Sequence, residues 1–278
     1  TYGVFWVGLL VYVRVLKPIL LLRRPYEVES VTPERGNAWS LTVRPVAHPG
    51  LKFMPGQFAW ITALSSPFAD AEHPFSFSSS ASQPGHLTFT IKELGDFTRQ
   101  VKNLQPGQKV YVDGPFGHFS IDRQPHAEQF VFIAGGVGIT PTMSMLRSMA
   151  DRGDKRPVTL LYANKDWDSI IFREELDSLK NALHLNLVHV LEKPPAGWDG
   201  ETGFVNRAVL ERHLPKATLE LARLRLAALH QGLVKGWLLH GKDVTPGVWA
   251  LQPARVLGKA PPAMNYPVFL DRIPLRDQ

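Results

Sequence analysis

The chain has 278 residues, of which 44% are hydrophobic and 20% are charged, a composition typical of a globular protein with room for two domains. It contains no cysteine, which excludes disulfides, thiolate zinc sites, cysteine-ligated iron–sulfur clusters and cysteine nucleophiles. The net charge is +6, but the basic excess lies near the two ends and the middle is almost neutral. We therefore expect no nucleic-acid partner, and we place no metal site.

Residues 1–25 form an apolar segment that carries basic residues but no acidic one. A membrane span needs about 20 apolar residues, and a basic residue at its centre costs about 2.5–3.5 kcal/mol. Because Arg14 and Lys17 interrupt the run and the chain begins with Thr1, we predict the end of a span whose start lies upstream. Both side chains then reach the membrane interface, and the following arginines lie on the cytoplasmic side. The alternative is an amphipathic helix lying on the next domain.

From Tyr26 the hydrophobic pattern changes to an alternation with period two, in short segments separated by Pro, Gly and Asn clusters. This pattern predicts a small antiparallel β-barrel, which we assign to residues 26–125. The predicted strands are residues 26–32, 38–45, 57–63, 73–79, 86–91 and 109–114.

In residues 126–216, apolar strands alternate with amphipathic helices, which predicts βαβ units around a parallel sheet. The predicted strands are residues 129–133, 158–163 and 185–191, and the predicted helices are 140–153, 172–183 and 205–214. Residues 217–278 show no clear alternation of strand and helix, and we treat them as an atypical C-terminal segment.

The first of three candidate motifs is the aromatic strand His73-Pro74-Phe75-Ser76. Its backbone and the Ser76 hydroxyl can lie along the edge of a flat heteroaromatic ring, with Phe75 packed near that ring. The alternative is a plain amphipathic strand.

The second motif runs from Lys92 to Thr98. Gly95 is expected to permit a tight turn, and Thr98 to open a helix whose exposed N–H groups favour a phosphate. Lys92 adds a positive charge. The alternative is a surface helix capped by Asp96.

The third motif, Gly135-Gly136-Val137-Gly138-Ile139-Thr140-Pro141, follows a buried strand and opens a helix. Glycines let the backbone approach a pyrophosphate, and Pro141 suits a first helical turn. The spacing differs from the Rossmann G-x-G-x-x-G pattern. The alternative is tight packing of the strand against the helix.

Together and in this order, with Gly114-Pro115-Phe116-Gly117 between the second and the third, these motifs resemble the ferredoxin–NADP reductase superfamily over about residues 25–215. Many members have Arg-x-Tyr-Ser where this chain has His-Pro-Phe-Ser. That form, and an apolar segment joined through Leu22-Arg23-Arg24-Pro25, is similar to the ferric reductase and NADPH oxidase branch. Residues 162–176 are also similar to reductases of ring-hydroxylating oxygenases.

The resemblance implies that the barrel binds FAD and the second domain binds NADPH or NADH. It places Ser76, the catalytic candidate, near the flavin N5 and His73 near the flavin phosphates. It assigns cofactor binding to His73, Pro74, Phe75, Ser76, Lys92, Gly95, Phe97, Thr98, Gly135, Gly136, Gly138, Thr140, Pro141, Asn164 and Lys165. Lys165 tolerates a 2′-phosphate, which favours NADPH; the alternative is a solvated lysine.

The resemblance further implies an NAD(P)H-dependent flavin oxidoreductase that passes electrons to a haem-bearing membrane bundle or another one-electron acceptor. A soluble-type reductase for an iron–sulfur partner is the first alternative. Family members end in a Cys-Gly-Pro-x-x-Met turn beside the nicotinamide, whereas this chain has only Pro261-Pro262-Ala263-Met264. A catalytically incompetent flavin-binding fragment is therefore the second alternative, and we expect slow hydride transfer.

Overall fold

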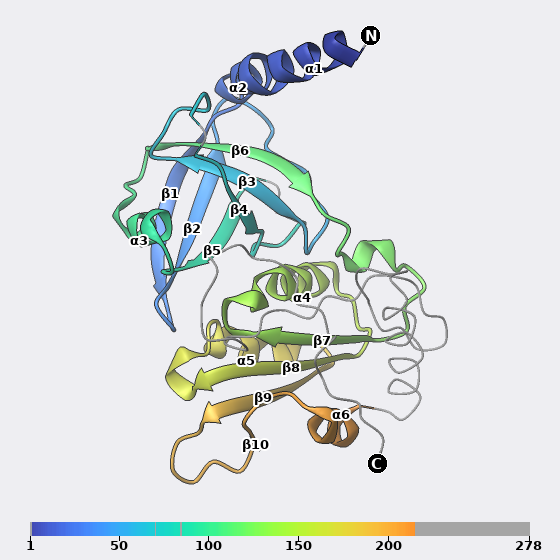
Figure 1. Ribbon diagram of the computed structural model, residues 1–278. Helices are drawn as coiled ribbons and strands as arrows, with labels where there is room; N and C mark the ends of the chain where they lie inside the picture. The colour runs from blue at the N-terminus through green and yellow to red at the C-terminus, as the bar shows by residue number, and fades with distance from the viewer. Residues whose placement is uncertain (1, 70, 84, 215–278) are drawn as a thin grey trace.

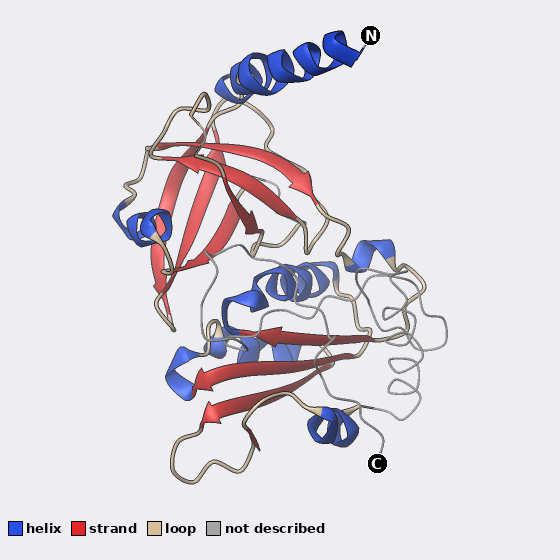
Figure 2. Cartoon of the chain, in the orientation of Figure 1, coloured by secondary structure: helices blue, strands red, loops and turns tan. Residues whose placement is uncertain are grey.

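The structure is a computed structural model that describes residues 2–69, 71–83 and 85–214. Figure 1 shows an N-terminal helix, a curled antiparallel sheet and a parallel sheet with helices, in that order along the chain. The same layers appear by secondary structure in Figure 2. The predictions made for residues 217–278 lie outside the described residues.

The curled sheet has the strand order β4-β3-β6-β1-β2-β5, and its paired strands are antiparallel. A bridge between Phe77 and Phe89 brings the two edge strands together, so the sheet curls into a half-barrel around buried side chains such as Leu41 and Phe89. This confirms the predicted barrel. The strands are β1 (Tyr26–Glu34), β2 (Ala38–Pro45), β3 (Phe58–Ala63), β4 (His73–Ser76), β5 (Leu87–Lys92) and β6 (Lys109–Phe116). The short helices α3 (Asp96–Gln100) and η2 (Val101–Asn103) connect β5 to β6.

The second sheet is parallel, with the order β10-β9-β8-β7, as the alternation of strands and helices predicted. Its strands are β7 (Phe130–Gly135), β8 (Val158–Asp166), β9 (Leu185–Lys193) and β10 (Glu201–Thr202). Its helices are α4 (Thr140–Arg152), α5 (Arg173–Ala182) and α6 (Arg207–His213), with the short turns η3 (Ile121–Arg123), η4 (Gly136–Ile139) and η5 (Trp167–Ser169). The two-residue β10 was not predicted from the sequence.

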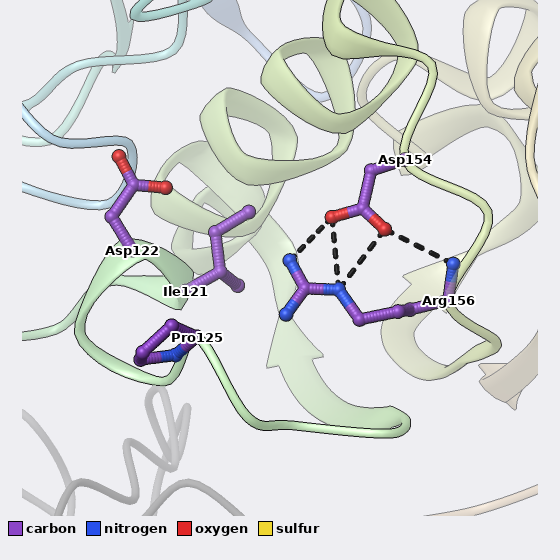
Figure 3. Close-up of a pocket in the computed structure, with 5 residues that line it drawn as sticks. All are labelled: Ile121, Asp122, Pro125, Asp154 and Arg156. Atoms are coloured by element: carbon purple, nitrogen blue, oxygen red, sulfur yellow. Dashed lines mark hydrogen bonds and ion pairs between the residues drawn. The ribbon is translucent and has the colours of Figure 1, made fainter.

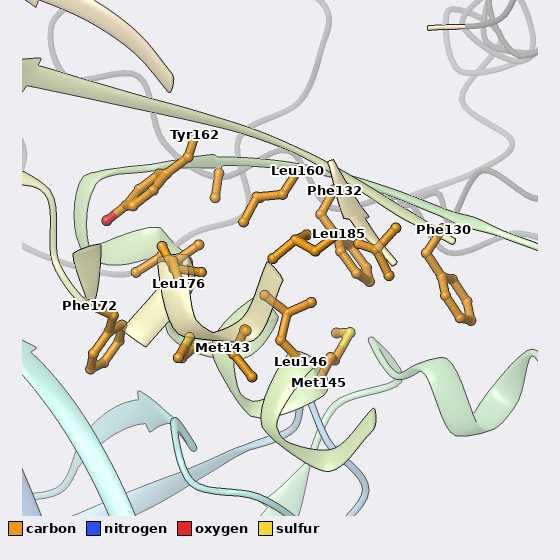
Figure 4. Packing of buried hydrophobic residues seen from close by; sticks show 14 of the residues in the cluster. Phe130, Phe132, Met143, Met145, Leu146, Leu160, Tyr162, Phe172, Leu176 and Leu185 are labelled. Carbon is orange, nitrogen blue, oxygen red and sulfur yellow. The ribbon is translucent and has the colours of Figure 1, made fainter. Parts of the chain in front are cut away.

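The two faces of the parallel sheet have separate cores because successive strand residues point to opposite sides. Phe130 and Phe132 of β7 face α4 and α5, where they join a buried cluster with Met143 and Leu146 (Figure 4). The opposite face packs against α6 through Val209. Helices therefore cover both faces, as a buried parallel sheet requires.

The N-terminal helix consists of α1 (Tyr2–Val11), a π-helical stretch η1 (Tyr12–Leu16) and α2 (Lys17–Leu22). It is the only helix in the described part of the chain that is long and apolar enough to cross a membrane. None of α1 is buried, so α1 does not lie on the half-barrel, whereas Pro18 of α2 is buried. Lys17 also differs from the prediction, because its ammonium pairs with Glu72 (2.9 Å) and Asp113 (2.8 Å) of the half-barrel.

The two sheets meet through α4, which lies between the half-barrel and β7 (Figure 1). Gly56 of the half-barrel has φ +97°, and a β-carbon there would overlap the Met145 methyl group and the Phe119 carbonyl. A glycine at this position is therefore what allows α4 to approach the half-barrel so closely.

Candidate functional site

The aromatic strand and the turn after β5 meet in space. The His73 ring on β4 stacks on the Phe97 ring of α3, with centroids 3.9 Å apart and planes within 8°. Phe75 lies 6.0 Å from the same ring. All three side chains are only half-buried. The structure thus brings the first two motifs together in one aromatic cluster.

Pro74 and Ser76 point to the other face of β4 because side chains alternate along a strand. Register places Ser76 opposite Phe58, which in turn lies opposite Phe116. Ser76 is half-buried, whereas Phe116 is exposed. The candidate hydroxyl therefore lies at a partly open edge of the half-barrel, next to aromatic side chains.

The turn before α3 is held by Thr98, not by Asp96. The Thr98 hydroxyl accepts hydrogen bonds from the N–H groups of Leu94 and Gly95, both at 2.8 Å. The expectation that Gly95 serves a tight turn is wrong, since its φ of −142° is extended backbone open to any residue. Asp96 begins the helix instead of capping it.

Lys92 ends β5, and the next residue fixes the position of the turn. The Glu93 carboxylate accepts hydrogen bonds from the Trp39 indole (2.7 Å) and the Lys102 ammonium (3.1 Å). These two donors hold the pKa of Glu93 below its usual value. The turn is thus tied to the half-barrel on one side, and a β-carbon on Gly95 would meet no atom within 4 Å on the other.

The glycine loop lies at the carboxyl end of β7, the edge where parallel α/β sheets bind ligands. Gly136 adopts φ +51°, a left-handed conformation that favours glycine, and a β-carbon there would again meet no atom within 4 Å. Its carbonyl accepts a hydrogen bond from the Tyr162 hydroxyl of β8 at 3.0 Å. Burial raises the pKa of Tyr162, which keeps this donor protonated.

Asn164 and Lys165 lie at the same edge, because Ala163 of β8 is in register with Gly135 of β7. Asn164 is buried, and neither atom of its amide has a hydrogen-bond partner of normal geometry among the described residues. Lys165 is exposed. A buried amide without a partner is costly to a protein, so Asn164 is a candidate for binding a polar ligand.

The remaining predicted residues of the loop lie deeper. Gly138, Thr140 and Pro141 are buried, and Pro141 occupies the first turn of α4, as expected. The 3₁₀ turn η4 runs directly into α4. The combined helix therefore starts at the half-buried Gly136, whose backbone is the part of this motif open to a ligand.

The two half-sites are adjacent, since η4 packs against β5 of the half-barrel. We call them the flavin half-site (His73–Ser76 with Lys92–Thr98) and the nucleotide half-site (Gly135–Pro141 with Asn164 and Lys165). The residues present fit the two cofactors that the resemblance implies. The open approach to Gly95 and Gly136 leaves room for phosphates, and the Asn164 amide has no hydrogen-bond partner of normal geometry among the described residues.

A shallow cavity of about 490 Å³ lies elsewhere, between the end of η3 and the loop before β8 (Figure 3). Its charged residues are already paired, Asp154 with Arg156 and Asp122 with Arg152. The cavity lies at the amino end of β8, opposite the glycine loop. It therefore has neither the position nor the free polar groups of a cofactor site.

Sequence reasoning missed Tyr162, although a tyrosine within an apolar buried strand usually has a hydrogen-bond partner for its hydroxyl. It also missed a cluster under the nucleotide half-site. The His189 ring lies 5.6 Å from Trp167, which lies 5.4 Å from Trp198. Both ring nitrogens of His189 are buried without a partner among the described residues, and burial lowers its pKa to about 4.

Comparison with known families assigns a domain to each sheet. Residues 26–120 match a family described as an FAD-binding domain, and residues 132–226 match one described as an oxidoreductase NAD-binding domain. The two matches occur in the order that the motifs predicted.

Among curated proteins, the chain is similar to NADH-cytochrome b5 reductase 1 of Cryptococcus neoformans (36% identity over 140 residues, 48% of this chain and 47% of the relative). It is also similar to NADH-cytochrome b5 reductase 2 of Mycosarcoma maydis (32% over 154 residues, 54% of this chain and 44% of the relative). The chain thus spans about half the length of the curated relatives it matches.

Solved structures share the fold. The cytochrome b5 reductase domain of Ulva prolifera nitrate reductase superposes with a TM-score of 0.59 at 23% identity, covering 69% of this chain and 82% of that one. The ferredoxin NADP+ reductase of Neisseria gonorrhoeae gives 0.56 at 18% identity, covering 68% and 75%. At such identities the likeness establishes the fold alone.

Proposed function

This chain belongs to the ferredoxin–NADP reductase superfamily, with an FAD-binding domain before an NAD-binding domain, and from that premise we propose an NAD(P)H-dependent flavin oxidoreductase that serves a one-electron acceptor. We assign the FAD-binding domain to residues 26–125 and the NAD(P)H-binding domain to residues 126–216. When bound, FAD supplies the conversion between two-electron and one-electron chemistry. The protein supplies position, electrostatics and exclusion of competing reactions.

The observation that carries the proposal is the meeting of the three motifs. The His73–Phe97 stack joins the first motif to the second, and the packing of η4 on β5 brings the third beside them. In this proposal Phe75 and Ser76 border the flavin ring, and Gly95, Phe97 and Thr98 border its phosphates. The nucleotide half-site receives the dinucleotide, with Asn164 as a hydrogen-bonding group.

The test uses Gly95, because neither the backbone conformation nor the described neighbours require a glycine at this position. The φ of −142° suits any residue and an added β-carbon meets no described atom within 4 Å, so we expect Gly95→Val to fold without strain. Gly8→Val is the matched control, because a β-carbon at Gly8 also meets nothing within 4 Å and the position lies far away in α1. We expect the purified wild-type chain and Gly8→Val to take up FAD, seen as flavin absorbance. Gly95→Val should fold with the same far-UV circular dichroism and lose FAD. A folded wild-type chain that takes up no flavin refutes the proposal.

We place the acceptor at a membrane, where a haem-bearing bundle or a separate haem protein receives the electrons. Tyr2–Leu22 is apolar and exposed along most of its length, and the exposed Arg23 and Arg24 follow it, which favours a cytoplasmic position for the flavin domain. The names of the curated relatives specify NADH and cytochrome b5. A soluble cytochrome b5 is therefore the first acceptor to test.

The acceptor experiment compares three electron acceptors for the chain in detergent: ferricyanide, cytochrome b5 and an iron–sulfur protein. Rapid reduction of ferricyanide together with cytochrome b5 supports a separate haem protein. Reduction of ferricyanide alone supports a haem in a membrane bundle. Reduction of an added iron–sulfur protein, with no reduction of cytochrome b5, contradicts a haem acceptor.

A further inference from the structure

Three polar residues on α4 face the half-barrel from the other side of the domain boundary. Ser144, Arg147 and Ser148 are spaced at i, i+3 and i+4, which places them on one face of the helix. This face meets residues 78–81, the segment that follows β4. We call the three side chains and that segment the α4 latch.

The two serines bind the backbone of this segment. The Ser144 hydroxyl donates to the Ser79 carbonyl at 2.7 Å, and the Ala81 N–H donates to the Ser148 hydroxyl at 2.9 Å. Ser148 in turn donates to the Ser144 carbonyl at 2.7 Å. Both serine side chains are fully buried. The Ser80 hydroxyl also donates to the Ser148 hydroxyl at 3.4 Å, but the two shorter contacts end on main-chain groups, so the latch mainly holds the backbone path of the segment.

Arg147 completes the latch and is itself held in place. Its Nη1 donates to the Ser78 carbonyl at 2.6 Å, while Nε and Nη2 donate to the two oxygens of Glu175 at 2.7 and 2.6 Å. The guanidinium also lies 4.8 Å from the centre of the Phe172 ring. A guanidinium fixed by a bidentate carboxylate and a ring face has little freedom to move, so it defines where Ser78 lies.

The latch joins the two half-sites by a short route. Residue 78 lies two positions after Ser76, and its N–H donates to the Thr88 carbonyl of β5 at 2.8 Å. At the other end, α4 begins directly after the glycine loop. The segment that leaves the flavin half-site is thus bound to the helix that begins at the nucleotide half-site.

We propose that Ser144, Arg147 and Ser148 are positioning residues that set the separation between the flavin strand and the glycine loop. The inference rests on the proposed function, because the separation matters only if two cofactors must meet across it. Transfer between two bound rings needs contact within about 3–3.5 Å, and a displacement of 1 Å can cost about a hundredfold in rate. Buried hydrogen bonds to main-chain groups are suited to keep the flavin strand and the glycine loop at a separation constant to within such a distance.

The first arm of the test needs no cofactor. Because the chain has no cysteine, spin labels can be attached at Asn103→Cys in the half-barrel and Asn181→Cys beyond the latch, both exposed positions. Pulsed electron resonance on the full chain in detergent gives the distance distribution between them. The test variant combines Arg147→Lys with Ser144→Ala, which keeps a positive charge near Glu175 but removes the planar guanidinium that binds Ser78 and Glu175 together, and the hydroxyl that donates to Ser79. The control is Arg35→Ala, which breaks an exposed ion pair with Glu174 across the same boundary.

We expect a narrow distribution in the wild type and in Arg35→Ala, and a broader or shifted one in the double variant. The second arm measures flavin content, NAD(P)H affinity and anaerobic flavin bleaching. The double variant should keep both cofactors, lose about tenfold or more in bleaching rate, and show a weaker long-wavelength charge-transfer band. Ser144→Ala alone should lie between.

An unchanged distance distribution in the double variant overturns the inference. So does a changed distribution with an unchanged bleaching rate and charge-transfer band, since the latch would then be merely structural. Failure of the wild-type chain to take up FAD refutes the proposed function instead, and the distance arm still decides whether the latch sets the separation.

Discussion

The flavin half-site and the nucleotide half-site differ in whether side chains or backbone form most of their surface. The flavin half-site is made of side chains on an edge strand and a five-residue helix, where His73 and Phe97 stack face to face. The nucleotide half-site centres on the backbone of its glycine loop, with Gly136 at a positive φ and its carbonyl held by Tyr162, and Asn164 and Lys165 add side chains at the same edge. The first should therefore depend on side-chain identity and the second on backbone conformation. Replacing one residue at a time distinguishes the two.

The largest expected effect is at Gly136. In Gly136→Val the left-handed conformation costs about 1–2 kcal/mol, so the loop shifts and dinucleotide affinity falls about tenfold or more. FAD uptake should be unchanged. Gly153→Val is the matched control, because Gly153 also has a positive φ and open space but lies at the far end of α4. Titration with NAD(P)H measures the effect. Equal losses of NAD(P)H affinity in Gly136→Val and Gly153→Val would mean that Gly136 affects binding only through the stability of the fold.

The next largest effect is a loss of folding stability at acidic pH. His189 has a folded pKa of about 4, which lies below the ordinary value of 6.5 because of burial, with Lys180 and Arg173 adding to the shift and Asp177 opposing it. The unfolded chain therefore binds more protons below pH 6.5, and stability falls as the pH drops toward 4. About 2 kcal/mol should be lost between pH 7.5 and pH 5.

This loss should be confined to the domain of the nucleotide half-site. Hydrogen exchange in β8 and β9 should accelerate at pH 5, while β1 and β2 change little. His189→Gln should flatten the pH dependence, and His126→Gln, at an exposed position, should leave it intact. The same acid response in His189→Gln and the wild type would rule out this residue as its source.

A smaller effect is expected in the flavin half-site. Phe97→Ala removes the partner of His73, and an aromatic pair contributes about 0.5–1.5 kcal/mol beyond area burial, which corresponds to about a threefold to tenfold loss of FAD affinity. Phe204→Ala, which truncates an exposed phenylalanine elsewhere, should bind FAD normally. Flavin fluorescence titration measures both. Normal affinity in Phe97→Ala would mean that backbone defines this half-site too.

The smallest effect is at Lys165. Lys165 is exposed, so any pairing with a 2′-phosphate is screened and contributes about 1 kcal/mol or less. Lys165→Glu should weaken NADPH by about fivefold relative to NADH, and the exposed Lys52→Glu should change neither. Comparison of the two Michaelis constants checks this. If the ratio of the Michaelis constants for NADPH and NADH is the same in the variant and the wild type, Lys165 is a solvated lysine that does not contact the 2′-phosphate.

Local patterns were enough to predict most of the fold. Alternation with period two predicted five of the half-barrel strands to within two residues at each end, because one face of each strand is buried. The strand at 73–79 was too long by three residues: after Ser76 only the single bridge at Phe77 continues the pairing. Gly95, and Asp96 as the alternative helix cap, were misjudged because the Thr98 hydroxyl accepts the hydrogen bonds of the turn.

The sequence by itself determined the order of the domains, the strands and helices, and the place of the glycine loop between a buried strand and a helix. These follow from periodicity and from the conformational range of glycine, which are local properties. Only the tertiary structure decided that Phe97 lies on His73, that Asn164 is buried with no partner of normal geometry in the part of the chain that the structure describes, and that α4 binds residues 78–81. Those contacts join residues distant in the chain, and several end on main-chain carbonyls, which every residue has and which therefore leave no mark in the sequence.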